Sequence, residues 1–70
     1  MRRRLVNSSS LRSLGYETRP QTLEIEFHSG SVYQYFGVPR RVLEEMLAQH
    51  SLGTYFNAEV RDVYQCVRVR

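Results

Sequence analysis

Residues 22–36 read TLEIEFHSGSVYQYF, and this stretch decides the fold. In its first half, Leu23, Ile25 and Phe27 alternate with two glutamates, which predicts a strand with one buried face and one wet face. The HSGS sequence that follows is rich in turn formers, and residues 31–36 provide the returning strand. The stretch therefore predicts an antiparallel hairpin.

The length of the hairpin loop determines which way Tyr33 and Tyr35 face. A two-residue loop turns both tyrosines toward solvent and places Gln34 among the buried residues. A three-residue loop with Gly30 in the left-handed conformation shifts the register by one, so that both tyrosines lie on the core face. We favour this second register, because it leaves the amide of Gln34 in water and gives the sheet a continuous apolar face.

The flanking segments extend this hairpin into a small sheet. Residues 11–17, LRSLGYE, predict a preceding strand, and the turn at residues 18–21 contains Pro20, which disfavours helix there. The tail, residues 63–70, alternates sufficiently to be a candidate edge strand. We therefore expect a three-stranded antiparallel meander, with a fourth strand as a candidate addition at the C-terminus.

Two helices are predicted after the hairpin. Pro39 suits the first turn of a helix, where its missing N–H costs nothing. Apolar positions then recur every three or four residues and form one stripe, at Val42, Leu43, Met46, Leu47 and His50. Ser51 is a suitable N-cap for a short second helix over residues 52–57. The predicted fold class is α+β, with the meander packed against one main helix and this short second helix.

The chain is small, and its positive charge lies at one end. It has 70 residues, of which 41% are hydrophobic, so we expect one folded domain without a deep substrate cavity. The first twelve residues contain four arginines and no acid, whereas six arginines and seven acids follow. We predict a flexible basic arm at residues 1–9 and a single, nearly neutral domain at residues 10–70.

Catalytic and metal-binding patterns are weak in this sequence. His28, His50 and Cys66 form no paired ligand motif, so no metal and no cofactor are predicted. Glu24 and Glu26 share a strand face, where carboxylates are usually solvated, and the serines near the N-terminus have no partner base at a diagnostic spacing. We therefore expect a protein that is not an enzyme.

The sequence also bears on location. No stretch approaches the roughly 20 apolar residues that a membrane span needs. The start MRRRLV is basic but is followed by no apolar segment of a signal peptide. The single cysteine cannot form an internal disulfide. These features predict a cytoplasmic protein with no membrane partner.

The order of aromatic, glycine and proline residues resembles a known family. The string F-x-x-G-x-x-Y-x-Y-x-x-V-P occurs at Phe27, Gly30, Tyr33, Tyr35, Val38 and Pro39. S-L-G-Y precedes it, and S-x-G-x-Y-F-N follows it at Ser51, Gly53, Tyr55, Phe56 and Asn57. Over about residues 6–66 this pattern resembles the KTSC domain, a module found at the C-terminus of some lysyl-tRNA synthetases and as stand-alone small proteins. The resemblance implies an accessory role with RNA, and we expect the motif residues to be mainly structural.

Two further arginines stand at the start of the predicted main helix. The helix dipole disfavours Arg40 and Arg41 there by about 0.3–1 kcal/mol. One interpretation is that they form surface ion pairs with Glu44 and Glu45, four residues later. The other is a phosphate site, in which both arginines act together with the free N–H groups of the helix.

These observations support two functional hypotheses. The first is a non-catalytic accessory module that binds RNA or another nucleic acid through Arg2, Arg3, Arg4, Arg40 and Arg41. The alternative is a protein–protein interaction module, acting through a sheet edge or as a homodimer, with no nucleic-acid role. The nearly neutral body favours the alternative, whereas the basic arm favours the first. We expect a monomer or a weak dimer.

Overall fold

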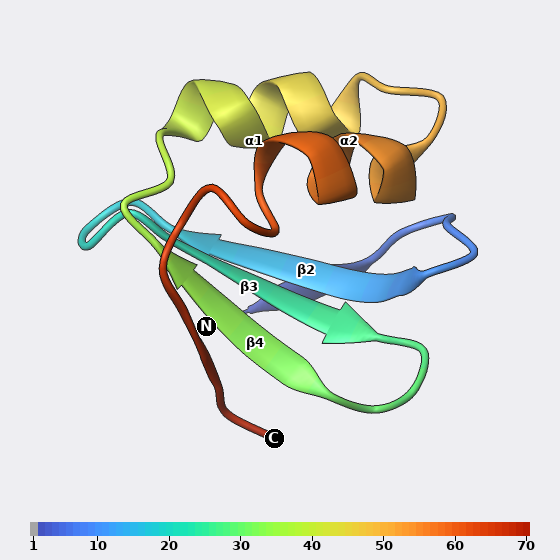
Figure 1. Cartoon of the computed structure of the whole chain (residues 1–70), viewed down its shortest axis with the longest axis horizontal. Coiled ribbons are helices and arrows are strands. Elements are labelled where there is room, and N and C mark those ends of the chain that lie inside the picture. Colours follow the sequence, from blue (N-terminus) through green and yellow to red (C-terminus); the bar gives the residue numbers. More distant parts are fainter. Residues whose placement is uncertain (1) are drawn as a thin grey trace.

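The computed structural model describes residues 2–70, which form a five-stranded antiparallel sheet with two helices on one of its faces (Figure 1). The strands are β1 (Arg3–Leu5), β2 (Leu11–Glu17), β3 (Thr22–Phe27), β4 (Val32–Phe36) and β5 (Cys66–Arg68). They lie side by side in sequence order. The helices, α1 (Arg40–Leu47) and α2 (Leu52–Glu59), stand between β4 and β5 in the chain. The α+β class and the central meander are as predicted.

The sheet has more strands than the three predicted. β5 is the candidate edge strand in the tail. β1 was not anticipated: residues 3–5, expected within a flexible arm, pair with β2 and place Arg4 opposite Leu14. The physical reason is that the exposed edge of β2 offers unpaired N–H and C=O groups, which the backbone of the arm satisfies.

The hairpin of β3 and β4 adopts the favoured register. Tyr33 lies opposite Ile25 and Tyr35 lies opposite Leu23. Gly30 has a φ of +97°, in the region that favours glycine, as the three-residue loop requires. Tyr35 is buried and Tyr33 is half-buried, so the pair stands at the margin of the core.

Both helices begin close to where the sequence predicts. Pro39 is the N-cap of α1, and the Ser51 side chain caps α2 by accepting a hydrogen bond from the Thr54 N–H. α1 buries Val42, Leu43 and Met46 of the predicted stripe. The prediction that His50 continues the apolar stripe of this helix is wrong. α1 ends at Leu47, and His50 is exposed in the short link, because the chain becomes extended at Ser51 to cap α2.

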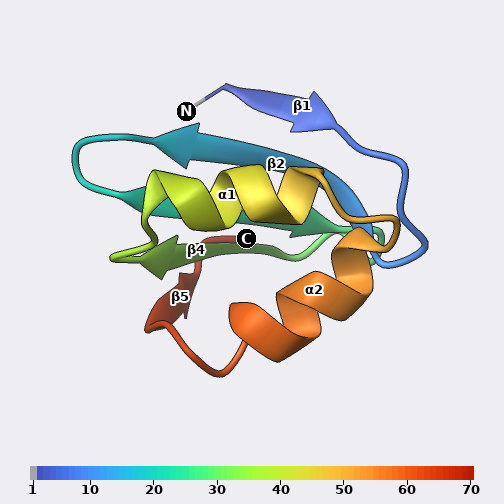
Figure 2. The ribbon, with the colours of Figure 1, turned by 90° about the horizontal axis from the view of Figure 1, so that it is seen from above.

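The core lies between the helices and one face of the sheet. Its fully buried large side chains are Leu11, Leu23, Ile25, Val38, Met46, Phe56 and Val60. Seen from above, α1 lies over the middle of the sheet and α2 lies on the β4 side (Figure 2). This placement of α2 brings its residues next to the hairpin of β3 and β4.

Candidate functional site

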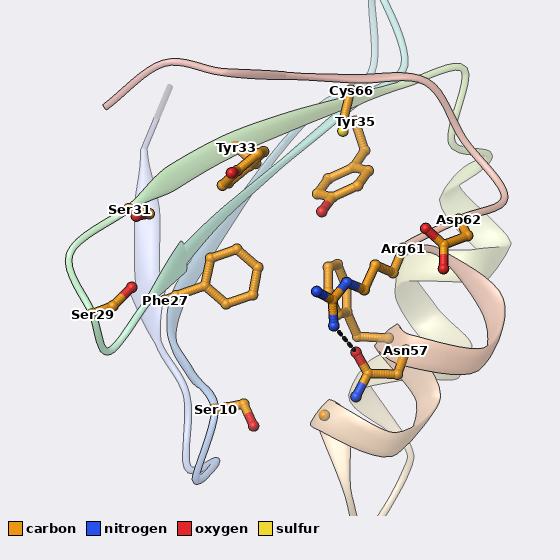
Figure 3. A pocket seen from close by; sticks show the side chains of 12 residues that line it. Ser10, Phe27, Ser29, Ser31, Tyr33, Tyr35, Asn57, Arg61, Asp62 and Cys66 are labelled. Atoms are coloured by element: carbon orange, nitrogen blue, oxygen red, sulfur yellow. Dashed lines mark hydrogen bonds between the residues drawn. The ribbon is translucent and has the colours of Figure 1, made fainter.

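An open cavity of about 460 Å³ lies between the hairpin of β3 and β4 and helix α2 (Figure 3). The hairpin contributes Phe27, Ser29, Ser31, Tyr33 and Tyr35 to its lining. Helix α2 and the turn after it contribute Gly53, Phe56, Asn57, Arg61 and Asp62. Sites for small molecules typically measure about 300–1,000 Å³, so this volume suits one small ligand. The short chain predicts no deep cavity, and this one is open at the surface.

Aromatic rings form the walls of this cavity. Phe56 packs edge-on against Tyr35 and Phe27, with centroid separations of 5.3 and 5.7 Å. Phe27 and Tyr33 also meet edge-on, at 5.8 Å. Phe56 and Tyr35 are buried, whereas Phe27 and Tyr33 are half-buried and leave part of their rings accessible. The cavity thus has a buried aromatic floor and accessible aromatic walls.

Polar groups surround these rings. The Arg61 side chain extends into the cavity, where its Nη1 donates to Oδ1 of Asn57 over 3.4 Å (Figure 3). The Arg61 N–H donates to the Phe56 carbonyl over 2.9 Å, which fixes this residue just beyond α2. Burial raises the pKa of Tyr35 to about 12, with a smaller contribution from Cys66. The Tyr35 hydroxyl, like that of any tyrosine at neutral pH, is protonated and can donate a hydrogen bond.

Six motif residues line this cavity, although the sequence indicated a mainly structural role for them. They are Phe27, Tyr33, Tyr35, Gly53, Phe56 and Asn57. Gly53 lies where α2 approaches the loop before β2: a Cβ there would stand 3.4 Å from the Ser10 Oγ, in van der Waals contact. The signal for this site was the motif itself, whose two halves are distant in sequence and meet here.

Other motif residues hold the fold together. The Tyr16 hydroxyl donates to the Val38 carbonyl over 2.7 Å and so attaches β2 to the segment before α1. The Tyr55 hydroxyl donates to Oε1 of Glu45 over 2.9 Å and joins the two helices. For Val38 and Tyr55, these contacts are consistent with the structural role that we expected.

The arginines predicted from sequence lie on the other side of the molecule. Arg2, Arg3 and Arg4 line a small cavity of about 190 Å³ next to Tyr16 and to residues of α1. Arg40 also lies close to Tyr16: burial raises the pKa of Tyr16, and the charge of Arg40 opposes this rise. Pairing of β1 with β2 therefore brings the N-terminal arginines to the side of α1 where Arg40 stands.

The surroundings of Arg40 and Arg41 differ. Arg40 Nε lies 3.5 Å from Oε2 of Glu44, and both side chains are more than 60% exposed. Arg41 is exposed one residue further along α1. Glu45, which the sequence offered as its ion-pair partner, instead accepts a hydrogen bond from Tyr55. An exposed pair such as Arg40–Glu44 contributes little to stability.

Comparison with known proteins assigns the chain to a family. The sequence model of the KTSC domain matches residues 7–64. The chain belongs to the KTSC domain family. The crystal structure of a KTSC domain protein from Yersinia pestis matches 99% of this chain and 97% of its own, with a TM-score of 0.95 and 32% identity. The fold described above is therefore that of the family.

Two relatives show where KTSC domains occur. An uncharacterized protein of Stutzerimonas stutzeri is 51% identical over 57 residues, which are 81% of this chain and 80% of that protein. A lysine–tRNA ligase of Nostoc punctiforme is 42% identical over 57 residues. The match spans 81% of this chain but only 10% of the ligase. Such domains thus exist both as small proteins and as part of a much longer enzyme.

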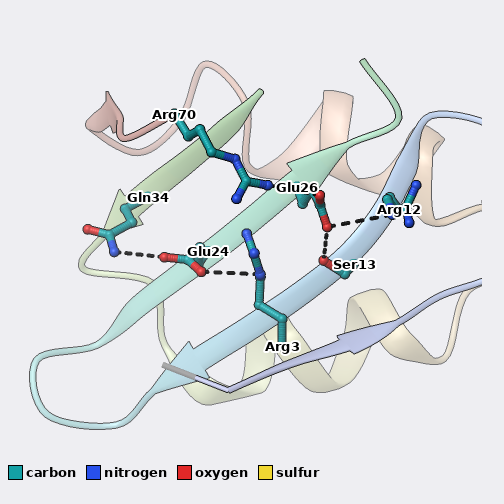
Figure 4. Close-up of polar contacts among 7 residues, drawn as sticks. All are labelled: Arg3, Arg12, Ser13, Glu24, Glu26, Gln34 and Arg70. Carbon is teal, nitrogen blue, oxygen red and sulfur yellow. Dashed lines mark hydrogen bonds and ion pairs between the residues drawn. The ribbon is translucent and has the colours of Figure 1, made fainter. Parts of the chain in front are cut away.

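The face of this KTSC domain opposite the helices carries a charged network (Figure 4). Glu24 accepts a hydrogen bond from the Gln34 amide over 2.9 Å, and Arg3 Nε lies 3.5 Å from its carboxylate. The two carboxylates of β3 were expected to be solvated, but the side chains of Glu24 and Glu26 are only 12% and 15% exposed. Arg3 is therefore directed to a different face from Arg4, which lies opposite Leu14 of the core.

Glu26 has the larger set of partners in this network. The Ser13 hydroxyl donates to it over 2.7 Å, and Arg70 Nη2 donates to it over 3.0 Å. Arg12 Nε lies 3.9 Å from the same carboxylate. The hydrogen bond from Ser13 lowers the pKa of Glu26, and the nearby arginines, including Arg3, lower it further. Arginines from both ends of the chain thus neutralise the acids of the central strand.

Among residues 2–70, no three His, Cys, Asp or Glu side chains are grouped so that they could hold a metal ion. The Nε2 of His28 contacts the Ser8 carbonyl at 2.8 Å, and Cys66 is exposed at the margin of the large cavity. Neither helix in this part of the chain has the length and apolar character needed to cross a membrane.

Proposed function

We propose that this KTSC domain is a non-catalytic accessory module that binds single-stranded RNA at its β1–α1 edge, defined as Arg2, Arg4, Arg40 and Arg41. The observation that supports the proposal is the position of the N-terminal arginines beside Tyr16, whose hydroxyl donates to the Val38 carbonyl, two residues before Arg40. Arg3, also expected at this surface, has its guanidinium next to Glu24 and contributes less. Arg2, Arg4 and Arg40 offer three cations to a phosphate backbone there. Arg41 adds a fourth at the helix start, on the side of α1 toward α2, because Glu45 one turn later bonds Tyr55 of α2.

RNA is the favoured nucleic acid because a related domain occurs within an enzyme that acts on RNA. A relative carries the same module within a protein named as a lysine–tRNA ligase, whose name specifies an RNA substrate. Phosphate binding also suits the start of α1, where no side chain caps the helix and backbone N–H groups can donate to an anion. The remainder of the chain is nearly neutral, so the edge supplies most of the attraction and the binding is weak.

The salt dependence of binding tests this proposal. Four phosphate contacts give a log–log slope near −3 for a single strand, because each contact contributes about −0.7. We expect the double variant Arg40→Glu, Arg41→Glu to abolish binding of a fluorescent single-stranded RNA while the melting temperature is retained. Arg68→Glu on β5 changes the charge as much as either single variant and serves as the matched control. If Arg68→Glu and Arg40→Glu weaken RNA binding equally, the loss is due to the change in net charge and the proposed site is contradicted.

The alternative of a protein-interaction module has one observation in its favour. Phe36, Val67 and Val69 are exposed apolar side chains at the β4–β5 side of the sheet. Val67 stands opposite Gln34, and both lie on the face away from the helices. Exposed apolar groups at a sheet edge are typical of contact surfaces. This surface would bind a protein and takes no part in the proposed RNA site.

A further inference from the structure

The large cavity between the hairpin and α2 lies apart from the β1–α1 edge, and the proposed function does not use it. Its lining combines two features that one ligand can use together. Accessible ring surface is present on Phe27 and Tyr33, and a guanidinium projects from Arg61. A ligand that uses both features has a flat apolar part and an anionic part.

The Arg61 guanidinium is available to such a ligand. Its contact with Asn57 is 3.4 Å long, beyond the usual range of about 2.7–3.2 Å for a strong N–H···O bond. Figure 3 shows the guanidinium within the cavity, where Asp62 also contributes to the lining without an ion pair to Arg61 among residues 2–70. A guanidinium held so loosely can bind a phosphate through two parallel hydrogen bonds.

The polar groups around the rings suit a nucleotide. The amide of Asn57 presents a donor and an acceptor, the pattern needed to pair with the edge of a base. The Tyr35 hydroxyl is directed into the same space, and hydroxyl groups of Ser29 and Ser31 line the opposite rim (Figure 3). The volume of about 460 Å³ admits one unpaired base with its sugar and phosphate, and a base pair in a duplex cannot enter.

We infer that this cavity binds one nucleoside phosphate, with the phosphate at Arg61 and the base between Phe27 and Tyr33. Because these rings stand at 82° to each other, the base stacks on one ring and meets the other with its edge. The same chemistry is present in a free mononucleotide and in an unpaired nucleotide of an RNA strand. The inference does not depend on the β1–α1 edge, because no arginine of that edge lines the cavity. In an RNA complex the edge would hold the strand and the cavity would hold one base.

Titration with adenosine 5′-monophosphate, followed by NMR of backbone and aromatic signals, tests this site. We expect saturable shifts at Phe27, Tyr33, Asn57 and Arg61. Arg61→Gln should weaken binding about tenfold, the usual effect of losing a charged hydrogen bond. It should leave the weaker binding of adenosine unchanged. Arg19→Gln, an exposed arginine in the turn between β2 and β3, is the matched control.

Two more variants separate the parts of the ligand. Asp62→Asn should strengthen binding of the monophosphate, because it removes a negative charge near the phosphate, and should not affect adenosine. Asn57→Ala removes an exposed side chain, so it tests base recognition without loss of the core. The inference is overturned if millimolar monophosphate shifts no cavity signal. It is also overturned if ribose 5-phosphate binds as well as the nucleotide, since the base would then contribute nothing.

The source of the nucleotide is decided by a second titration, with a single-stranded RNA and a strand of equal length without bases. If the cavity signals shift with the RNA but not with the strand that lacks bases, the site binds a base of the RNA. Shifts with the monophosphate but with neither strand identify a free nucleotide as the ligand. The monophosphate could bind in the cavity while the double variant Arg40→Glu, Arg41→Glu still binds RNA. That result would support the cavity inference and contradict the proposed RNA edge.

Discussion

The ring of Tyr35 packs edge-on against the ring of Phe56, with 5.3 Å between their centroids. Both rings are buried, and together they connect strand β4 to helix α2. The contact exists because the three-residue loop turns Tyr35 toward the helices, opposite Leu23. It also forms the floor of the large cavity, so the register of one hairpin determines both the core and the candidate site.

Truncation of this ring tests the register. We expect Tyr35→Ala to lower the free energy of unfolding by about 3–5 kcal/mol, the usual cost of removing a buried aromatic side chain. A small domain has about 5 kcal/mol in total, so this variant should be largely unfolded. Tyr35→Phe keeps the ring and should remain folded. A Tyr35→Ala protein with an unchanged urea midpoint would indicate that the ring faces solvent.

The hairpin could be predicted because its signals are local. Alternation in residues 22–27 and a single glycine in the loop fix the buried face and the turn. β1 could not be predicted in this way, because residues 3–5 show no alternation and are ordered by an unpaired edge of β2. The residues there indicate a basic segment, and its backbone gains partners only when β2 is in place in the sheet.

The cavity and the charged network could not be predicted from the sequence for a different reason. Phe27 and Asn57 come from segments that meet only when α2 is placed on the β4 side of the sheet. Likewise, Arg70 reaches Glu26 across 44 positions in the sequence, a pairing that no local spacing reveals. The family motif marked several of the residues involved, and a motif alone does not separate core positions from the lining of a site.

Alkaline pH should destabilise the fold through its tyrosines. Burial raises the pKa of Tyr35 to about 12, and burial with the hydrogen bond to Glu45 raises the pKa of Tyr55 to about 12. Unfolded tyrosine titrates near 10, so the folded state retains protons that the unfolded state has lost. The contribution of these two tyrosines to the free energy of unfolding should be fully present below about pH 10 and should be lost between about pH 10 and 12.

Tyr55→Phe isolates one of these groups. The variant loses the hydrogen bond to Glu45, so it should be less stable at pH 7. It should also lose stability less steeply between about pH 10 and 12, since one titrating group is gone. Urea unfolding at several pH values measures both effects. An unaltered pH dependence would show that Tyr55 is not protected by folding.

Acid pH should act on Glu26. Its folded pKa is lowered by the Ser13 hydrogen bond and the arginines, so its contribution is present above the unfolded pKa and lost as the pH falls through the folded value. Glu26→Gln should therefore be destabilised at neutral pH, and its deficit should shrink in acid. Glu17→Gln, an exposed acid at the end of β2, should show little effect at either pH. A constant deficit for Glu26→Gln would contradict this account.

The two sheet edges should limit self-association. β1 and β5 are each three residues long, and short edge strands offer little backbone for pairing with another chain. We expect sedimentation to show a monomer at micromolar concentration and at most a weak dimer at millimolar concentration. A dimer that persists on dilution would favour the protein-interaction alternative. Val67→Ser would then test whether the apolar β5 side forms its interface.

The most direct test of RNA binding is a ¹H–¹⁵N NMR titration of the intact chain with single-stranded RNA at low salt. The account predicts shifts at Arg2, Arg4, Tyr16, Arg40 and Arg41, which weaken as salt is added and disappear in Arg40→Glu, Arg41→Glu. Shifts confined to residues 2–4, with the start of α1 unaffected, would show that the folded domain does not bind the strand. No shifts at low salt would contradict the proposed function outright.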